Sequence, residues 1–352
     1  MKSIASAPGK IILFGEHFVV HGTKAILAAI DKRVTVTTTT KEIINPEKAL
    51  QGTLKINSQL GMFEIPMNVQ SVPLGALSVE GMSYEPLNEG PENLSWRGIK
   101  SEFRPFVYLV ANMFNRRGWS KHHPMKIEIT IDSDIPVGVG LGSSSACCVA
   151  AAASISASAE RNKLSMEEIV SVAEEAERTI FPDTSGADCA VCTYGGMIEY
   201  PSMEKFGHTS ALNLIISNSM IPHNTKNSVE KVSKFKENNE ERFSELCELE
   251  TKLIDEVIMA MKNNNATALG LKMSENQKYL EEIQISNDTL RDMMSSLKEI
   301  SLGTKITGAG DGGCIISLVE DKNLPKTTLL PKDKEYFSAK IDTEGVVWSV
   351  IE

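Results

Sequence analysis

The segment Pro136-Val-Gly-Val-Gly-Leu-Gly-Ser-Ser-Ser145 combines residue types that suit the binding of a phosphate group. Glycine lets backbone amides approach an anion and adopts dihedral angles that other residues avoid. The first amides of a helix have no intrahelical partner and carry the positive end of the helix dipole. The sequence therefore predicts a phosphate-binding turn at this point. Its expected contacts are Pro136, Gly138, Gly140, Leu141, Gly142, Ser143, Ser144 and Ser145.

Two standard nucleotide loops do not fit this segment. A Walker loop requires a lysine, and none follows Gly142. A dinucleotide fingerprint counted from Gly138 would need glycine where Ser143 stands. An ordinary glycine-rich turn remains the alternative.

The elements around the turn have the order that a phosphate site requires. Residues 126–132 alternate with period two, which predicts a strand, and the small residues 146–153 predict a closely packed helix. A second helix is expected over residues 103–117. Ser165 and Glu168 match a capping box, which predicts the start of a helix that runs to Arg178.

Composition bounds the class of protein. The chain has 352 residues, of which 41% are hydrophobic and 23% charged, and is long enough for two domains. A net charge of −10 argues against nucleic acid and anionic membranes as partners. No segment approaches the ~18 apolar residues of a membrane helix, and residues 1–8 lack the apolar core of a signal peptide. We expect a cytoplasmic protein.

The character of the chain changes after Gly195-Gly196, and we expect a domain boundary near residue 205. Before it, a strand and a turn are expected over residues 4–22 and a second strand over residues 34–40. The polar region from about 42 to 100 is expected to form hairpins and loops. After it, a short strand at 212–216 leads into charged helices and a final pair of strand regions. The expected helices are 227–236, 240–262, 266–282 and 288–299, and the strand regions are 306–319 and 336–350.

Cysteine and histidine spacings offer weaker candidates for chemistry. Cys189 and Cys192 form a C-x-x-C, but a zinc site needs a second matching pair, so buried free thiols are favoured. His17 and His21 lie four residues apart, but their neighbours do not match H-E-x-x-H. A metal is therefore not expected at these histidines.

Three further segments place the glycine turn in a family. They are Ala7–Gly22, Glu177–Asp188 and Lys305–Cys314. With the glycine turn, in this order and at these separations, they resemble the signatures of the GHMP small-molecule kinases. The opening segment is similar to that of the mevalonate kinase family, and residues 276–286 resemble the N-Q-x-x-L segment of that family. The resemblance covers most of the chain except residues 42–100.

The resemblance implies a two-domain α+β GHMP kinase fold and an ATP- and Mg²⁺-dependent enzyme. The N-terminal ATP-binding domain (1–205) would be like ribosomal protein S5 domain 2, and the C-terminal domain (206–352) would be ferredoxin-like. The implied reaction is phosphorylation of the 5-hydroxyl of mevalonate in isoprenoid synthesis. A homodimer is also implied. Phosphomevalonate kinase, another GHMP small-molecule kinase and a catalytically silent metabolite sensor remain as alternatives.

The resemblance also implies roles for individual residues. Asp188 would be the general base, with Lys10 beside it to stabilise developing charge. Ser144 and Glu177 would hold Mg²⁺, whose preferred ligands are hard oxygens. The substrate would meet Lys10, Glu16, His17, Asp188 and Thr225. Taken singly, these residues fit ordinary surface and turn positions equally well, and Glu177 fits a solvated helix face.

Two positions depart from the family pattern. Thr184 stands where proline is usual, which removes a fixed φ from the segment before Asp188. Asp311 stands where the third glycine motif usually has glycine. Its carboxylate would either repel a phosphate or pair with a cation such as Lys10 or bound Mg²⁺.

Overall fold

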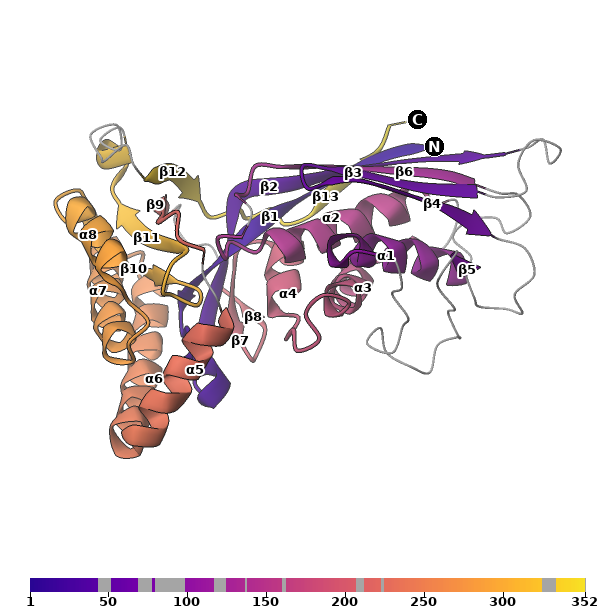
Figure 1. The fold of residues 1–352 in the computed structure, drawn as a ribbon. Coiled ribbons are helices and arrows are strands. Elements are labelled where there is room, and N and C mark those ends of the chain that lie inside the picture. The colour runs from indigo at the N-terminus through magenta and orange to yellow at the C-terminus, as the bar shows by residue number, and fades with distance from the viewer. Residues whose placement is uncertain are drawn as a thin grey trace.

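The chain folds around two β-sheets, each with helices packed against it (Figure 1). This computed structural model describes residues 1–43, 52–68, 78–79, 99–116, 125–136, 138–159, 163–206, 212–222, 225–324 and 334–351. No helix in these ranges is long and apolar enough to cross a bilayer. The mixture of helices and sheets agrees with the α+β class expected from the sequence.

The first sheet has nine strands, and β1 and β2 form its centre. Its order is β13-β1-β2-β6-β3-β4-β5, with β7 paired to β2 and β8 paired to β7. Among the strand pairings that the described residues form in this sheet, only that of β3 with β6 is parallel. The strands are β1 (Lys2–Phe14), β2 (Ala25–Glu42), β3 (Gly52–Ser58), β4 (Gly61–Asn68), β5 (Ser78–Val79), β6 (Met125–Ser133), β7 (Met197–Tyr200), β8 (Glu204–Lys205) and β13 (Val347–Val350).

Four helices cover one face of this sheet (Figure 1). They are α1 (Arg104–Asn115), α2 (Ser143–Ala157), α3 (Met166–Arg178) and α4 (Ala187–Tyr194). Nearly all of α2 is buried, because its small side chains let it pack closely on β1 and β2. Helix α3 begins with the expected capping box, in which Ser165 and Glu168 each bond the other's backbone amide.

The second sheet has the order β10-β11-β9-β12 and is antiparallel throughout. Its strands are β9 (Asn213–Asn218), β10 (Ser301–Thr307), β11 (Cys314–Val319) and β12 (Glu335–Lys340). Four helices belong to this region: α5 (Thr225–Asn238), α6 (Glu240–Lys262), α7 (Ala266–Glu282) and α8 (Asp288–Leu297). Helix α7 packs along β10, and α6 packs on α7.

The chain connects the two regions twice, once before β9 and once after β12. Strand β8 of the first sheet ends at Lys205 and β9 of the second begins at Asn213. At the other end β13 returns to pair antiparallel with β1, so the chain ends in the first sheet. Arg33 on β2 forms an ion pair with Asp342 and thereby fixes the returning segment. The division into domains 1–205 and 206–352 remains a prediction. Strand β13 belongs to the second range by sequence but pairs with β1 in the first sheet.

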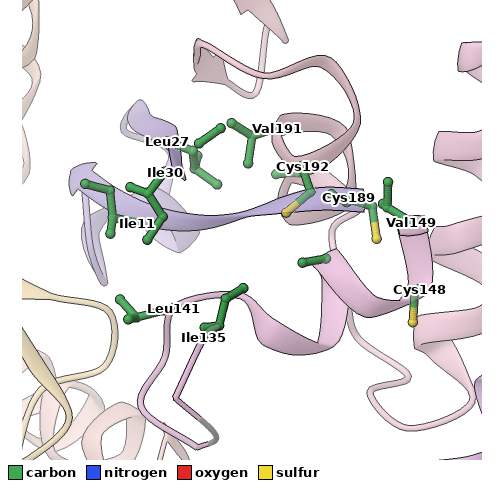
Figure 2. Close-up of a cluster of buried hydrophobic side chains, with 14 of the residues drawn as sticks. Ile11, Leu27, Ile30, Ile135, Leu141, Cys148, Val149, Cys189, Val191 and Cys192 are labelled. Carbon is green, nitrogen blue, oxygen red and sulfur yellow. The ribbon is translucent and has the colours of Figure 1, made fainter. Parts of the chain in front are cut away.

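The buried core runs through both regions and reaches the glycine turn (Figure 2). Figure 2 shows Cys148 of α2 and Cys189 and Cys192 of α4 among apolar side chains from β1, β2 and the turn. All three thiols are free and buried. Burial raises the pKa of each well above its ordinary value. These cysteines therefore serve as small core residues.

One expectation from the sequence changes in detail, and the expected hairpin in the region 42–100 is confirmed. The single strand region at 306–319 is divided into β10 and β11 by a turn over residues 308–313, because that turn contains glycines at positive φ. The region 42–100 contributes the hairpin β3–β4, which extends the first sheet. Most of the remainder of that region lies outside the described residues.

Candidate active site

The glycine turn between β6 and α2 adopts the conformation that its sequence suggests. Gly138, Gly140 and Gly142 all have left-handed φ, at 76°, 83° and 71°. A Cβ at Gly142 would lie 2.5 Å from Cγ of Lys10. Glycine at this position therefore permits both the turn and the close passage of Lys10. The amide of Lys10 donates to the carbonyl of Leu141 at 2.9 Å, which fixes β1 against the turn.

Lys10 and Asp188 form an ion pair at the end of this turn. Lys10 Nζ lies 2.9 Å from Asp188 Oδ2, and the exposed fractions of the two side chains are 8% and 33%. Asp188 belongs to the first turn of α4, which begins after Gly186 at φ 74°. Burial alone would lower the pKa of Lys10, but Asp188, with a smaller contribution from Glu177, raises it overall. Lys10 is thus a fixed cation beside a carboxylate that solvent can reach.

Glu177, at the end of α3, lies among hydroxyl and thiol groups. Ser145 Oγ donates to its Oε1 at 2.5 Å and Thr184 Oγ1 to its Oε2 at 2.8 Å. Cys189 Sγ lies 3.6 Å from the same Oε2. Burial raises the pKa of Glu177, partly offset by the Ser145 hydrogen bond. The departure at Thr184 therefore supplies a hydrogen bond to the carboxylate that the resemblance assigns to the metal.

The serines that open α2 have different surroundings. Ser145 is buried and donates to Glu177, whereas Ser143 and Ser144 are half-buried at the N-terminus of α2. Of these serines, Ser145 is the one whose hydroxyl contacts the Glu177 carboxylate. Hydroxyl and carboxylate oxygens are chemically suited to Mg²⁺. Within the described residues no group of three or more His, Cys, Asp or Glu residues forms a separate metal cluster.

The segment after β1 passes from the first region into contact with the second. Gly15 and His17 have positive φ, at 96° and 61°. His17 Nε2 is 2.9 Å from the carbonyl of Ala309, and burial lowers the pKa of His17. Thr307 Oγ1 accepts from the amide of Ile12 at 3.1 Å. The turn that carries Glu16 and His17 is therefore held by the loop between β10 and β11.

Glu16 itself points into the protein. Its carboxylate pairs with Lys305 of β10, and the exposed fractions of these side chains are 1% and 0%. The sequence led us to expect Glu16 at the surface of a substrate pocket. In the structure its side chain is covered, while the neighbouring His17 is half-buried. Any contribution of Glu16 to substrate recognition must act through the shape of the turn.

Asp311 is paired with Lys231 of α5 at 2.5 Å. The sequence offered Lys10 as its partner, but Lys10 is held by Asp188. Thr225 begins α5 and is exposed. Its neighbour Asn224 lies outside the described residues. Helix α5 is thus tied to the loop between β10 and β11 through the Asp311 carboxylate.

Three of these contacts escaped the sequence analysis. They are the pairs Lys305–Glu16, Thr184–Glu177 and Lys231–Asp311. Lys305 and Glu16 are 289 residues apart in the sequence, and Thr184 was considered only because it stands where proline is usual. A partial signal existed for Lys305, because it is a single lysine in a strand of otherwise small or apolar residues. Lys231 gave no signal, since it is one of several lysines in a charged helix.

Known proteins share both the sequence and the architecture of this chain. Residues 105–196 match the family described as GHMP kinases N terminal domain, and residues 257–328 match GHMP kinases C terminal. A mevalonate kinase of Aeropyrum pernix is 29% identical, covering 97% of this chain and 96% of that protein. The corresponding values for a mevalonate kinase of Pyrococcus furiosus are 31%, 94% and 93%.

The fold has a close counterpart among solved structures. The crystal structure of the Methanococcus jannaschii mevalonate kinase superposes with a TM-score of 0.74 at 26% identity, covering 96% of this chain and 98% of that one. The two-domain α+β GHMP kinase fold expected from the sequence is confirmed. Because the likeness in sequence extends along nearly the whole chain, this protein belongs to the mevalonate kinase family of the GHMP kinases.

Proposed function

We propose that this enzyme transfers the γ-phosphoryl group of ATP to the 5-hydroxyl of mevalonate. Kinases of this family use ATP as co-substrate, and the relatives from A. pernix and P. furiosus carry the name mevalonate kinase. The observation that carries the proposal is the Lys10–Asp188 pair beside a turn of three glycines at positive φ. Such a pair can align a hydroxyl next to a bound phosphate.

In this reaction the hydroxyl oxygen of mevalonate forms a bond to the γ-phosphorus, and the bond from that phosphorus to the bridging oxygen breaks to release ADP. Asp188 orients the hydroxyl and accepts its proton. Lys10 holds Asp188 in place and faces the negative charge that develops on the transferred group. The amides at the start of α2 neutralise phosphate charge, which is the principal requirement of phosphoryl transfer.

Mg²⁺ accompanies the nucleotide in this proposal. The oxygen donors of Ser144 and Glu177 fit it, because Mg²⁺ prefers hard oxygen ligands and Glu177 is a buried carboxylate that forms no ion pair among the described residues. Burial raises the pKa of Glu177. Bound there, the ion would offset the charge of the phosphates. Ser145 donates to Oε1 of Glu177 and Thr184 donates to its Oε2, and these two bonds orient the carboxylate.

The substrate side is assigned to His17 and Thr225, with Glu16 acting through the turn. A phosphorylated substrate would require a cationic clamp. Of the basic residues near this side, Lys10 and Lys231 are already paired with Asp188 and Asp311. Mevalonate is therefore favoured over phosphomevalonate. We further propose a cytoplasmic homodimer that acts in isoprenoid synthesis, and sedimentation of the purified protein would test the dimer.

A coupled assay of ADP release with mevalonate, phosphomevalonate and galactose tests the proposal. We expect kcat/KM for mevalonate to exceed that for phosphomevalonate by at least ~10²-fold, because in the described part of the chain Lys10 and Lys231 are already paired with carboxylates when the added dianion arrives. Phosphorus NMR of the product should show a phosphate ester on a methylene carbon. A tertiary ester, a preference for phosphomevalonate, or binding of mevalonate without turnover would reject the assigned activity.

A further inference from the structure

Behind the Glu16–His17 turn lies a buried cluster of three ionisable residues from three separate elements. Glu16 follows β1, Lys305 lies on β10, and Glu250 lies in the middle of α6. Their exposed fractions are 1%, 0% and 0%. Lys305 Nζ donates to Glu16 Oε1 and, at 2.7 Å, to the carbonyl of Ile306.

The charges of this cluster do not balance if every group is ionised. Two carboxylates and one ammonium would leave a net negative charge in the interior, and an uncompensated buried charge is costly enough that a group usually becomes neutral instead. Glu16 is in direct contact with the ammonium of Lys305. Glu250 is the carboxyl that lacks such a contact.

The partner of Glu250 is an amide, and their one hydrogen bond leaves an oxygen of each group without a partner. Asn276 Nδ2 donates to Glu250 Oε2 at 2.6 Å. The other oxygens of the two groups, Glu250 Oε1 and Asn276 Oδ1, are both buried without a hydrogen-bond partner. As two acceptors they cannot bond each other. A proton on Glu250 Oε1 converts it into a donor for Asn276 Oδ1, and one proton thus satisfies both atoms.

We propose that Glu250 is a neutral carboxylic acid paired side by side with the Asn276 amide, and that this pair positions the Glu16–His17 turn. A neutral Glu250 does not compete with Glu16 for the ammonium group of Lys305, so the Lys305–Glu16 ion pair is kept. The consequence for catalysis rests on the proposed function. Glu250 touches no substrate and is a positioning residue. The Asn276-Gln277 dipeptide gains a physical role from this arrangement, since Gln277 Oε1 also accepts from the amide of Ile306 at 2.9 Å.

The electrostatic surroundings agree with a neutral Glu250. Burial and then the Glu16 charge raise its pKa to about 7, against lowering by Lys305, Asn276 and the backbone of Gly15. The groups that face it are Glu16 before the turn, Lys305 on β10, and Asn276 and Tyr279 on α7. As the pH rises through about 7, Glu250 ionises and competes with Glu16 for Lys305. The turn should then loosen, and His17, one residue from Glu16, should sense the change.

Infrared spectroscopy of the protein without substrate tests the protonation directly. We expect the carbonyl band of a protonated carboxylic acid at pH 6, its loss as the pH rises through about 7, and its absence at pH 6 and above in Glu250→Gln. Glutamine reproduces the acid–amide pairing without a titratable proton. Glu248→Gln, at an exposed site on the same helix, is the matched control and should keep the band. A wild-type spectrum at pH 6 identical to that of Glu250→Gln would overturn the proposal.

Two measurements test the positioning. The ring resonances of labelled His17 should shift with the ionisation of Glu250 in the wild type and lose that component in Glu250→Gln, with no substrate present.

In turnover assays KM for mevalonate should rise by roughly two- to tenfold above pH 7, the equivalent of one hydrogen bond, with little change in kcat. The variant should lose this rise. A His17 titration and a KM profile unchanged by Glu250→Gln would reject the positioning role. Failure of the wild type to turn over mevalonate would reject the proposed function alone, since the spectroscopic results stand without it.

Discussion

Two lysine–carboxylate pairs each include one residue from the first 16 positions of the chain, and the pairs differ chiefly in access to solvent. In the Lys10–Asp188 pair the carboxylate is 33% exposed, whereas in the Lys305–Glu16 pair neither side chain exceeds 1%. An accessible carboxylate can meet a substrate and exchange a proton. A fully covered pair can only fix the geometry of the residues that carry it. The same chemical pair therefore serves two purposes, and burial decides which.

The elements that supply the carboxylates explain the difference. Asp188 lies in the first turn of α4, which begins directly after Gly186 with its left-handed φ of 74°, and the Asp188 carboxylate is 33% exposed. Glu16 lies between β1 and the second region, where β10 and α6 cover it. The covered pair thus joins the two sheets, and the open pair lies within the first region.

The largest effect is expected from breaking the covered pair on one side only. Lys305→Met should lower the free energy of unfolding by about 3–5 kcal/mol, because it leaves Glu16 buried beside Glu250 without a cation. Urea denaturation monitored by circular dichroism would measure this. The double variant Lys305→Met/Glu16→Gln should recover a large part of the loss. A single variant as stable as the wild type would show that the pair does not hold the two regions together.

The open pair should respond in activity rather than stability. Asp188→Asn keeps the shape of the side chain but removes its charge, so kcat should fall by at least ~10²-fold while the Kd for ATP changes little. Steady-state assays and nucleotide titration would measure the two quantities. If the variant kept about half of the wild-type turnover at saturating substrate, Asp188 would not be the base.

Glu177 is a third carboxylate, held by hydroxyls rather than by a lysine. If it holds Mg²⁺ with Ser144, Glu177→Ala should raise the Mg²⁺ concentration for half-maximal rate by about tenfold. Ser144→Ala should act in the same direction, and the double change should cost less than the sum of the two. Calorimetric titration of ATP with and without Mg²⁺ gives an independent readout. An unaltered Mg²⁺ requirement would assign Glu177 to the support of Ser145 and Thr184 alone.

The exposed pair Lys231–Asp311 should show the smallest effect. The side chain of Lys231 is 50% exposed, so Lys231→Met should change the free energy of unfolding by less than about 1 kcal/mol. Asp311→Gly loses the same ion pair but removes the backbone strain of a non-glycine residue at φ 58°, so the two contributions to the free energy of unfolding should nearly cancel. Thermal unfolding of both variants would measure this. A loss above about 2 kcal/mol in Lys231→Met would mean that α5 depends on this contact more than its exposure suggests.

Local pattern predicted much of the fold. The expected helices 240–262 and 266–282 coincide with α6 and α7, and the strand, turn and helix around Gly142 lie where the sequence placed them. Helical and strand periodicities act over a few residues, so they survive in any fold that buries the same faces. Ends were less accurate. The helix expected at 227–236 extends from Thr225 to Asn238 in α5, because helix ends depend on capping and tertiary contacts.

The sequence by itself predicted the glycine turn, the family and the residues that we propose for the site. Glycines at left-handed φ and a capping box are local requirements, and they can be read from single segments. Tertiary structure alone decided that Lys305 pairs with Glu16, that Glu250 joins them, and that Thr184 supports Glu177. Whether a charged side chain is buried, and beside which partner, depends on how distant strands and helices pack. For Lys305 and Glu16 that packing spans 289 residues, a distance over which local periodicity carries no information.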